Sequence, residues 1–340
     1  MRTNDTQIFW PHVSDFVVPI VPDQDFTINL KLVGNHCNMR CTYCYAHDAP
    51  PGGQAVLSPD LVATLIARIP DTHRLRFLLH GGEPLLYPRD QMAELLSVIT
   101  ARVQNRHDIR IQSNGTLLDD DWIDLFLSYC PEFVFSLSLD SLDEGGLRRL
   151  PGGGLGDIMR GKLALLQRRG VQVGIVATAS RSNRANFPTF IEGLTVFGVR
   201  YLTINRLRMN RGLRSGSNAW GLSEIEFVDV LDAVLHHWIE GRLFDRIQIQ
   251  PLMSLLMRDS GRLCTFVDRP SVCSGFLSLY PDGRVTICDH FDPEGIHMLS
   301  DCVDCPIHSW CGSGCYGEKK DKTFCQARFR LKSIIEQVLA

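Results

Sequence analysis

The sequence predicts an α/β protein built on a parallel sheet, followed by a smaller cysteine-rich region. Between residues 26 and 205, short apolar runs alternate with amphipathic stretches at the spacing of βαβ units. Polar loops directly follow four of these apolar runs. From residue 261 onward the composition shifts to cysteine, glycine and short segments, with too few apolar residues for an independent core. Bound metal would supply the missing stability of that region.

The elements of the first region follow one another in a regular order. We expect strands over 26–33, 75–80, 108–112, 133–137, 171–178 and 200–204. We expect helices over 59–69, 90–104, 120–129, 156–169, 185–197 and 223–240. Six strands are too few for a closed eight-unit barrel. In parallel sheets the chemistry lies at the carboxyl ends of the strands, which is where the polar loops fall. These loops are 37–44, 81–84, 113–116 and 138–140.

Length and composition exclude several classes of protein. The 340 residues suffice for one large α/β domain with a smaller one, and 44% hydrophobic content is ordinary for a globular chain. The net charge of −3 gives no basic excess, so we expect no nucleic-acid partner. No apolar run approaches the roughly 18 residues of a membrane span, and the amino terminus lacks the apolar core of a signal peptide. We therefore expect a cytoplasmic protein with no membrane partner.

The twelve cysteines indicate metal ligands or redox groups, because disulfides are rare in a reducing compartment. Three lie in the pattern Cys37-x3-Cys41-x2-Cys44, one stands alone at Cys130, and the other eight begin at Cys264. Three thiolates on one loop can hold three irons of a cubic iron–sulfur cluster and leave the fourth iron open. A zinc site closed by a nearby histidine is the alternative, although zinc usually takes four ligands in two separated pairs.

The first triplet, with Tyr43 before its last cysteine, resembles the signature of the radical S-adenosylmethionine (SAM) enzymes. The sequence Gly81-Gly-Glu-Pro84 is similar to the motif of that family for the amino group of SAM. Its two glycines permit close backbone approach, and Glu83 offers a carboxylate to an ammonium group. The resemblance covers residues 26–205 and implies a partial (β/α)6 barrel of the TIM type.

The resemblance also implies the chemistry of the site. In the family, the amino and carboxylate groups of SAM chelate the open iron, and an electron from the cluster releases a 5′-deoxyadenosyl radical that abstracts a hydrogen atom from the substrate. The implied ligands of this [4Fe–4S] cluster are Cys37, Cys41 and Cys44. The implied SAM contacts are Tyr43, Gly81, Gly82, Glu83, Pro84, Ser113, Asn114 and Arg149.

Alternatives remain for several of the implied SAM contacts. Arg148 is the alternative to Arg149 as the partner of the SAM carboxylate, and a plain loop role is the alternative for both. The same loop role is the alternative for Ser113 and Asn114. Family members usually carry Ser-x-Asp-Gly after the fourth strand, whereas Ser141 stands here in place of the glycine.

The carboxyl-terminal cysteines resemble the SPASM extension of radical SAM enzymes that modify peptides and proteins. Their spacing is Cys273-x9-Gly283-x4-Cys288, then a gap, then Cys302-x2-Cys305-x5-Cys311-x3-Cys315-x9-Cys325. The resemblance implies two auxiliary [4Fe–4S] clusters, which makes three clusters in all. One auxiliary cluster would take Cys264, Cys273, Cys288 and Cys315, and the other would take Cys302, Cys305, Cys311 and Cys325. A pair of zinc-ribbon sites is the alternative.

Asp289 directly follows Cys288. Sulfatase-maturing relatives and several peptide maturases carry a Cys-Asp pair at this place, so the resemblance implies that Asp289 is a catalytic base. A carboxylate that caps a turn is the alternative.

The function that the sequence favours is a radical SAM/SPASM oxidoreductase that abstracts a side-chain hydrogen from a ribosomally made precursor peptide (RiPP maturation). The sequences around Cys41–Asp48 and His80–Leu86 are most similar to cyclophane-forming maturases, which join an aromatic ring to another side chain. Thioether formation and formylglycine generation in sulfatases are the enzymatic alternatives. An iron–sulfur electron-transfer protein or a zinc scaffold is the non-enzymatic one. We expect an electron donor such as flavodoxin or ferredoxin as a second partner.

The resemblance also divides the chain into five segments. They are an amino-terminal arm (1–25), the barrel (26–220), a bridging helical region (221–260), the SPASM domain (261–325) and a carboxyl-terminal helix (326–340). Since the barrel begins by about residue 26, we expect peptide capture to use the barrel, the SPASM region or another protein.

Overall fold

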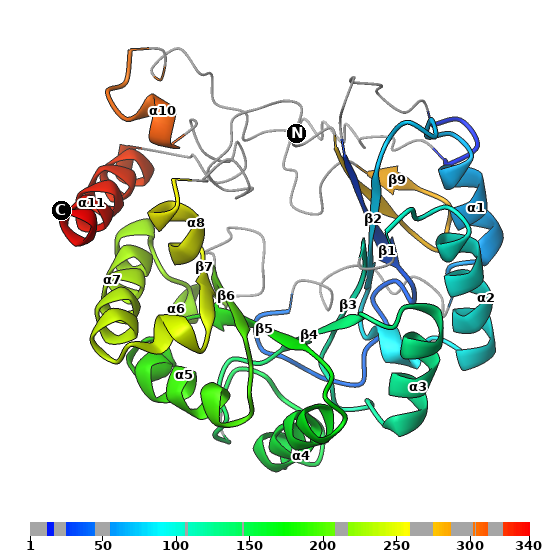
Figure 1. Ribbon diagram of the computed structural model, residues 1–340, viewed down its shortest axis with the longest axis horizontal. Helices are drawn as coiled ribbons and strands as arrows, with labels where there is room; N and C mark the ends of the chain where they lie inside the picture. Colours follow the sequence, from blue (N-terminus) through cyan, green and yellow to red (C-terminus); the bar gives the residue numbers. More distant parts are fainter. Residues whose placement is uncertain are drawn as a thin grey trace, which may run out of the picture.

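A curved sheet with helices on its outer face forms the body of the protein (Figure 1). The computed structural model describes residues 12–16, 25–44, 55–105, 108–144, 146–207, 217–258, 275–286, 302, 304–311 and 322–340. In these residues the sheet has nine strands, in the order β7-β6-β5-β4-β3-β2-β1-β8-β9. It bends into an open ring, and the helices that connect its strands lie outside the ring.

The strands are β1 (Phe26–Lys31), β2 (Leu75–His80), β3 (Ile109–Ser113), β4 (Val134–Ser138), β5 (Val173–Ala179), β6 (Tyr201–Arg206), β7 (Gln248–Gln250), β8 (Phe276–Leu279) and β9 (Val285–Thr286). The α-helices are α1 (Pro59–Ile66), α2 (Arg89–Thr100), α3 (Asp120–Tyr129), α4 (Leu155–Arg168), α5 (Phe187–Val196), α6 (Ser217–Trp220), α7 (Glu224–Glu240), α8 (Leu252–Leu256), α10 (His308–Cys311) and α11 (Lys322–Leu339).

The six predicted strands are all present and parallel, and the predicted fold class, a partial (β/α)6 barrel, is confirmed. Three further strands extend the sheet at its two ends. β7 pairs with β6 in parallel, β8 pairs with β1 in parallel, and β9 runs antiparallel to β8. The range of the predicted SPASM domain therefore contributes β8 and β9 to the barrel sheet, and the domain boundaries themselves stay a prediction.

Alternation along the strands separates the two faces of the sheet. On β1, Phe26, Ile28 and Leu30 are fully buried against the helices. The opposite face of the sheet carries mainly polar side chains, of which Gln112 and Thr178 are half-buried. The apolar core thus lies between sheet and helices, because each strand directs alternate side chains to opposite faces.

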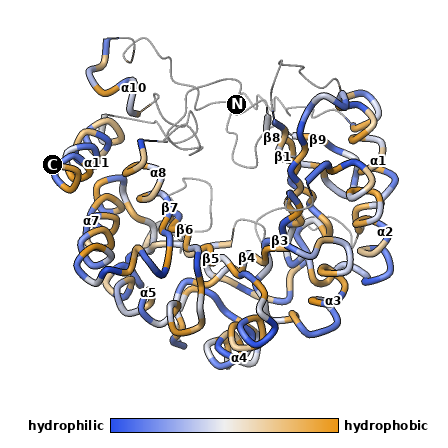
Figure 2. Tube along the Cα trace, in the orientation of Figure 1, coloured by the Kyte–Doolittle hydropathy of each residue, from blue (hydrophilic) through white to orange (hydrophobic). Residues whose placement is uncertain are grey.

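The helices cover the sheet with amphipathic faces, and the chain in Figure 2 accordingly alternates between apolar and polar colouring along them. α7 is the longest of those between β6 and β7. Ser223 caps it by accepting from the backbone N–H of Glu226, and the Glu226 side chain accepts from the Ser223 N–H in return. Leu231, Leu235 and Trp238 are buried on its inner face.

α11 begins four residues before the predicted carboxyl-terminal helix, so it includes Cys325. It lies beside α7 (Figure 1) and buries Ala327, Leu331 and Ile335 in the main core. Cys130, the cysteine outside both groups, is fully buried at the end of α3. None of the helices in the described ranges is long and apolar enough to cross a membrane.

Candidate active site

The loops that follow β1, β2, β3 and β4 meet at one rim of the sheet, as expected for the carboxyl ends of parallel strands. The first of these carries the cysteine triplet, and we call residues 37–44 the cysteine loop. Two backbone hydrogen bonds join the residues just before the cysteine loop to the loop after β2. Gly82 N–H donates to the Gly34 carbonyl at 2.7 Å, and Glu83 N–H donates to the His36 carbonyl at 2.8 Å.

These backbone contacts explain both glycines of the Gly81-Gly-Glu-Pro84 motif. A Cβ atom on Gly82 would lie 2.0 Å from the His36 carbonyl oxygen, which is backbone and cannot turn away. Gly81 has φ +122°, and a Cβ there would lie 3.2 Å from the Gly34 carbonyl oxygen. Pro84 is buried and begins a short 3₁₀ helix, Pro84–Leu86. The loop after β2 therefore packs directly against the cysteine loop.

Glu83 is fully buried and joins the ends of β2 and β3. Its Oε1 accepts from the Ser113 hydroxyl at 2.6 Å and from the Leu85 N–H at 3.0 Å, and its Oε2 accepts from the Asn114 N–H at 2.7 Å. Burial raises the pKa of this carboxyl, and the three hydrogen bonds oppose the rise. Because an ionised carboxylate has about four acceptor positions, one position is left for a ligand such as an ammonium group.

Ser113 and Asn114 are buried and already make protein contacts. The Ser113 hydroxyl donates to Glu83 and accepts from the Gly115 N–H at 2.9 Å. Asn114 Nδ2 donates to Asn38 Oδ1 at 2.8 Å, and Asn38 Nδ2 donates to the Thr116 hydroxyl at 2.9 Å. These two residues therefore hold Glu83 and the cysteine loop in place, and their predicted contact with the ribose of SAM stays a prediction.

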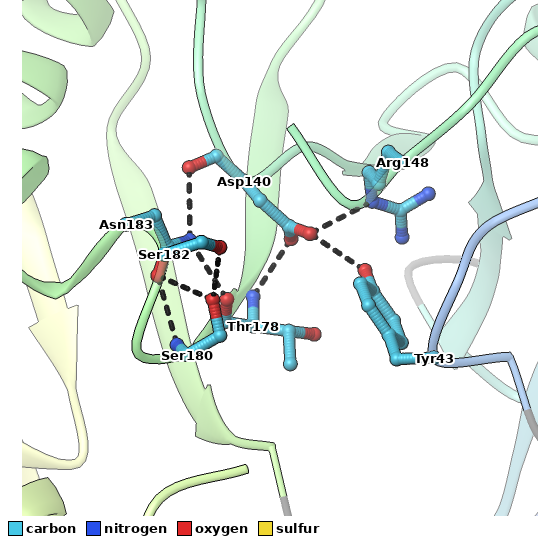
Figure 3. Close-up of polar contacts among 7 residues, drawn as sticks. All are labelled: Tyr43, Asp140, Arg148, Thr178, Ser180, Ser182 and Asn183. Atoms are coloured by element: carbon cyan, nitrogen blue, oxygen red, sulfur yellow. Dashed lines mark hydrogen bonds and ion pairs between the residues drawn. The ribbon is translucent and has the colours of Figure 1, made fainter. Parts of the chain in front are cut away.

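Asp140 links three separate segments at the rim (Figure 3). Its Oδ2 accepts from the Tyr43 hydroxyl at 2.6 Å and forms an ion pair with Arg148 Nε at 3.4 Å. Its Oδ1 accepts from the Thr178 N–H at the end of β5, at 2.8 Å. The Arg148 guanidinium lies 5.9 Å from the centroid of the Tyr43 ring. Burial raises the pKa of Tyr43 well above its usual range, so its hydroxyl keeps the proton that it donates.

The two adjacent arginines point to different places. Arg148 is directed into the site, whereas Arg149 is exposed. The Arg149 carbonyl accepts from the Arg40 N–H at 2.8 Å, and the Leu147 carbonyl accepts from the Thr42 N–H at 2.8 Å. The loop after β4 thus holds the cysteine loop through its backbone. Nothing in the geometry favours Arg149 over Arg148 as a SAM contact.

Sequence reasoning placed Asp140 at the rim but gave it no role, and it gave none to Asn38. The available signals were the Ser138-Leu-Asp140 sequence at a strand end and the position of Asn38 inside the cysteine motif. Neither signal indicates the partner, because Tyr43 and Asp140 are 97 positions apart in the chain.

The thiols of the cysteine loop are half-buried, and their charges act on one another. Burial raises the pKa of Cys37 to about 11, and the charges of Glu83, Cys41 and Cys44 add to the rise. The Met39 N–H donates to Cys37 Sγ at 3.4 Å, and Asn114 Nδ2 lies 3.8 Å from the same sulfur. A bound iron–sulfur cluster would stabilise these thiolates. Three thiols on one loop, with N–H groups directed at the sulfur of Cys37, fit an iron–sulfur cluster.

A second group of thiols surrounds a pocket between α10 and α11. Its walls include Cys302, Cys305, Cys311 and Cys325, which are the four predicted ligands of one auxiliary cluster. Burial raises the pKa of Cys311 to about 11, and the charges of the other three thiols add to the rise. The other predicted set (Cys264, Cys273, Cys288 and Cys315) and Asp289 lie outside the described residues.

In the described part of the chain, no group of three or more His, Cys, Asp or Glu side chains is arranged to hold a single metal ion. The thiolates of a cubic cluster each bind a different iron. Such thiolates therefore need not converge on one point as the ligands of one ion do.

Comparison with known proteins gives the same assignment as the site. Residues 32–179 match the model of the Radical SAM superfamily. A cysteine-type anaerobic sulfatase-maturating enzyme of Clostridium novyi (strain NT) is 21% identical over 361 aligned positions, which cover 91% of this chain and 94% of the relative.

Two solved structures are similar in fold. One is native anSMEcpe with bound AdoMet and Cp18Cys peptide, at a TM-score of 0.70 and 17% identity over 93% of this chain and 98% of that chain. The other is SuiB of Streptococcus suis bound to precursor peptide SuiA, at a TM-score of 0.63 and 13% identity over 88% and 76%. Residues 32–179 therefore form a radical SAM domain. The comparisons support SAM and one [4Fe–4S] cluster as the cofactors of this domain.

Proposed function

We propose that this protein is a radical SAM peptide maturase that abstracts a hydrogen atom from a side chain of a precursor peptide. The observation that carries the proposal is the presence of two separate thiol groups in one fold, one on the cysteine loop and one around the pocket of Cys302, Cys305, Cys311 and Cys325. The relatives support a peptide substrate, since a sulfatase-maturating enzyme matches 91% of the chain and both similar structures hold a peptide.

The residues at the rim then have distinct roles. Cys37, Cys41 and Cys44 hold the cluster, which when bound with SAM supplies the 5′-deoxyadenosyl radical. The remaining acceptor position of Glu83 takes the SAM ammonium, as expected for a buried carboxylate. Tyr43 lies beside the last cysteine, and its orientation is fixed by the hydrogen bond to Asp140. Arg148 balances the charge of Asp140, and Arg149 takes the carboxylate of SAM only if its exposed side chain turns inward.

The pocket between α10 and α11 is the proposed site of an auxiliary [4Fe–4S] cluster. Four thiols line it, and thiolates are the usual ligands of such clusters. The second auxiliary cluster on Cys264, Cys273, Cys288 and Cys315 and the base role of Asp289 are proposals on the sequence alone. The electron donor, flavodoxin or ferredoxin, is proposed on the same basis.

The bond that is made has two candidates. The first is an oxidative cross-link of the cyclophane type, favoured by the sequences around Cys41 and His80. The second is formylglycine formation on a sulfatase, favoured by the near full-length similarity to a sulfatase-maturating enzyme. The two products differ chemically. Formylglycine carries an aldehyde that reacts with hydrazides, whereas a cross-link removes two hydrogen atoms and joins two side chains without an aldehyde.

Iron content and SAM cleavage test the proposed chemistry together. Anaerobically reconstituted protein should contain about twelve irons and as many sulfides per chain, as three cubic clusters require. Replacing Cys37, Cys41 and Cys44 by alanine should remove about four irons and abolish 5′-deoxyadenosine formation with dithionite as the reductant. Cys130→Ala is the matched control and should change neither. Persistent 5′-deoxyadenosine formation in the triple variant would exclude the cysteine loop as the radical site.

Co-expression tests the substrate. The protein is co-expressed with any small peptide that is encoded beside its gene, and the purified protein is incubated with SAM, dithionite and synthetic sulfatase peptides that contain Cys or Ser. We expect loss of two hydrogen atoms from the encoded peptide, fragmentation blocked between the linked residues, and no reaction with hydrazide. A hydrazide-reactive product from a sulfatase peptide would select formylglycine formation instead.

A further inference from the structure

The four-thiol pocket has a cationic side chain in its wall. Arg328 lines the pocket together with Cys302, Cys305, Cys311 and Cys325, and it is 6% exposed. It follows Cys325 by three positions on α11, so the two side chains share one face of the helix. Withdrawing a guanidinium from water is costly, so its place beside the thiols calls for a compensating interaction.

Phe324 fixes the position of the guanidinium. The Arg328 guanidinium lies 4.6 Å from the centroid of the Phe324 ring, and Phe324 is 1% exposed. A cation over an aromatic face is attracted to it and keeps its charge. The charge lies close to the thiols, because Arg328 lines the same pocket as Cys311 and Cys325. An arginine stays protonated under all working conditions, so this field is permanent.

We propose that Arg328 raises the reduction potential of the cluster that these four cysteines bind. The inference rests on the proposed auxiliary cluster. A reduced cluster carries one more negative charge than the oxidised form, and a fixed positive charge in a buried wall therefore stabilises the reduced form. Arg328 acts on the reaction through the cluster and has no contact with the substrate. Its effect is to make the cluster a better electron acceptor during oxidative closure of the peptide.

Three variants separate charge from packing. Arg328→Gln removes the charge, and Arg328→Lys keeps it. Arg330→Gln is the matched control, since it removes the same charge two positions away, where Arg330 is exposed and pairs with Asp229 at 2.6 Å. The measurement is a redox titration followed by electron paramagnetic resonance. The signal to follow is the one that Cys325→Ala protein lacks.

At the wild-type midpoint potential, we expect the ratio of reduced to oxidised cluster to fall about tenfold in Arg328→Gln, which is about 59 mV for a one-electron couple. Arg328→Lys and Arg330→Gln should stay within about twofold of the wild type. An unchanged ratio in Arg328→Gln with all irons retained would overturn the inference and leave the proposed cluster standing.

Loss of iron has its own meaning. If Arg328→Gln loses the irons of this pocket, and Arg328→Lys keeps them with an unchanged ratio of reduced to oxidised cluster, the positive charge supports the cluster, as the inference requires. If both variants lose them, packing is the cause, and the inference fails. If the Cys325→Ala variant has the same iron content and the same signals as the wild type, the proposed auxiliary cluster is contradicted.

Discussion

Asp140 shows how a single carboxylate can determine the geometry of the rim. It accepts hydrogen bonds from the Tyr43 hydroxyl on the cysteine loop and from the Thr178 N–H on β5, and it pairs with Arg148 on the loop after β4. Its side chain is 9% exposed and that of Arg148 is 15% exposed, so water does little to replace either partner. Each charge is therefore balanced by the other, while the Tyr43 hydroxyl and the Thr178 N–H fix the position of the carboxylate.

Replacing Asp140 by asparagine should lower both the stability of the protein and the rate of SAM cleavage, although the two side chains have nearly the same shape. Asparagine can still accept from the Thr178 N–H, but Arg148 loses its counter-charge while it stays mostly buried. We expect the free energy of unfolding to fall by about 2 kcal/mol, and the rate of 5′-deoxyadenosine formation to fall several-fold. Guanidinium unfolding and single-turnover SAM cleavage measure the two effects. Asp143→Asn, at an exposed position on the same loop, is the control; equal stability of the two variants would show that the ion pair contributes nothing.

At the scale of elements, Glu226 connects the start of α7 to the loop after β5. Besides its role in the capping box, it accepts two hydrogen bonds from Arg181, both at 3.0 Å. The Arg181 hydrogen bonds, followed by the Ser223 N–H, lower the pKa of Glu226 to about 2 from an ordinary value of 4.5. A carboxyl with a lowered pKa in the folded state stabilises the fold fully above its unfolded pKa.

The stability that Glu226 supplies should therefore disappear in acid. At pH 7 we expect Glu226→Gln to lower the free energy of unfolding by about 1 kcal/mol, a modest value because the pair is partly solvated. The difference from wild type should persist down to about pH 5 and shrink as the pH falls from 4.5 toward 2. Urea unfolding of iron-free protein measures this difference in the free energy of unfolding at each pH, without interference from the loss of clusters in acid. Glu240→Gln, at the exposed end of the same helix, should show no such pH dependence; a constant difference for Glu226→Gln would refute the assignment.

The same scale shows what the sequence could predict about the fold. β1 to β6 were predictable because each is followed by an amphipathic helix. The regular alternation of short apolar runs with helical patterns supports both assignments. β7 was missed because Gln248–Gln250 has three residues and a single buried one. β8 was missed because Phe276–Leu279 lies in the cysteine-rich range, where its pairing with β1 requires contacts some 250 positions apart. Short strands depend on such distant partners, which leave no local pattern.

The site divides in a similar way. The spacing predicted the cysteine triplet, and the resemblance to the SPASM extension predicted the set Cys302, Cys305, Cys311 and Cys325 that surrounds one pocket. Spacing could not show that Arg148 and not Arg149 points inward, because adjacent residues on a loop have no fixed period. It also could not show that Ser113 and Asn114 already bond to Glu83 and Asn38. Ligand motifs are local in sequence, whereas the side chains that orient them are not.

At the scale of the whole molecule, α11 joins the two thiol sites into one body. One face buries Ala327, Leu331 and Ile335 in the barrel core beside α7. The amino-terminal end of the same helix presents Cys325 and Phe324 to Cys311 and Ile307. That second cluster of apolar residues is small, so its burial alone gives little stability. A bound cluster would supply the rest, since the free energy of metal binding is also free energy of folding.

Removing the auxiliary site should therefore loosen α11 without unfolding the barrel. In a variant with Cys311 and Cys325 replaced by alanine, we expect about four irons to be lost, and hydrogen exchange in 322–339 to become at least about tenfold faster. Amides of β3, β4 and β5 should exchange as in wild type, because their partners are the neighbouring strands of the sheet. Cys130→Ala supplies the control: it removes a buried thiol from the barrel and should keep both the irons and the protection of α11. Unchanged exchange in α11 after loss of the irons would mean that packing against α7 alone holds the helix, and that the two sites are mechanically independent.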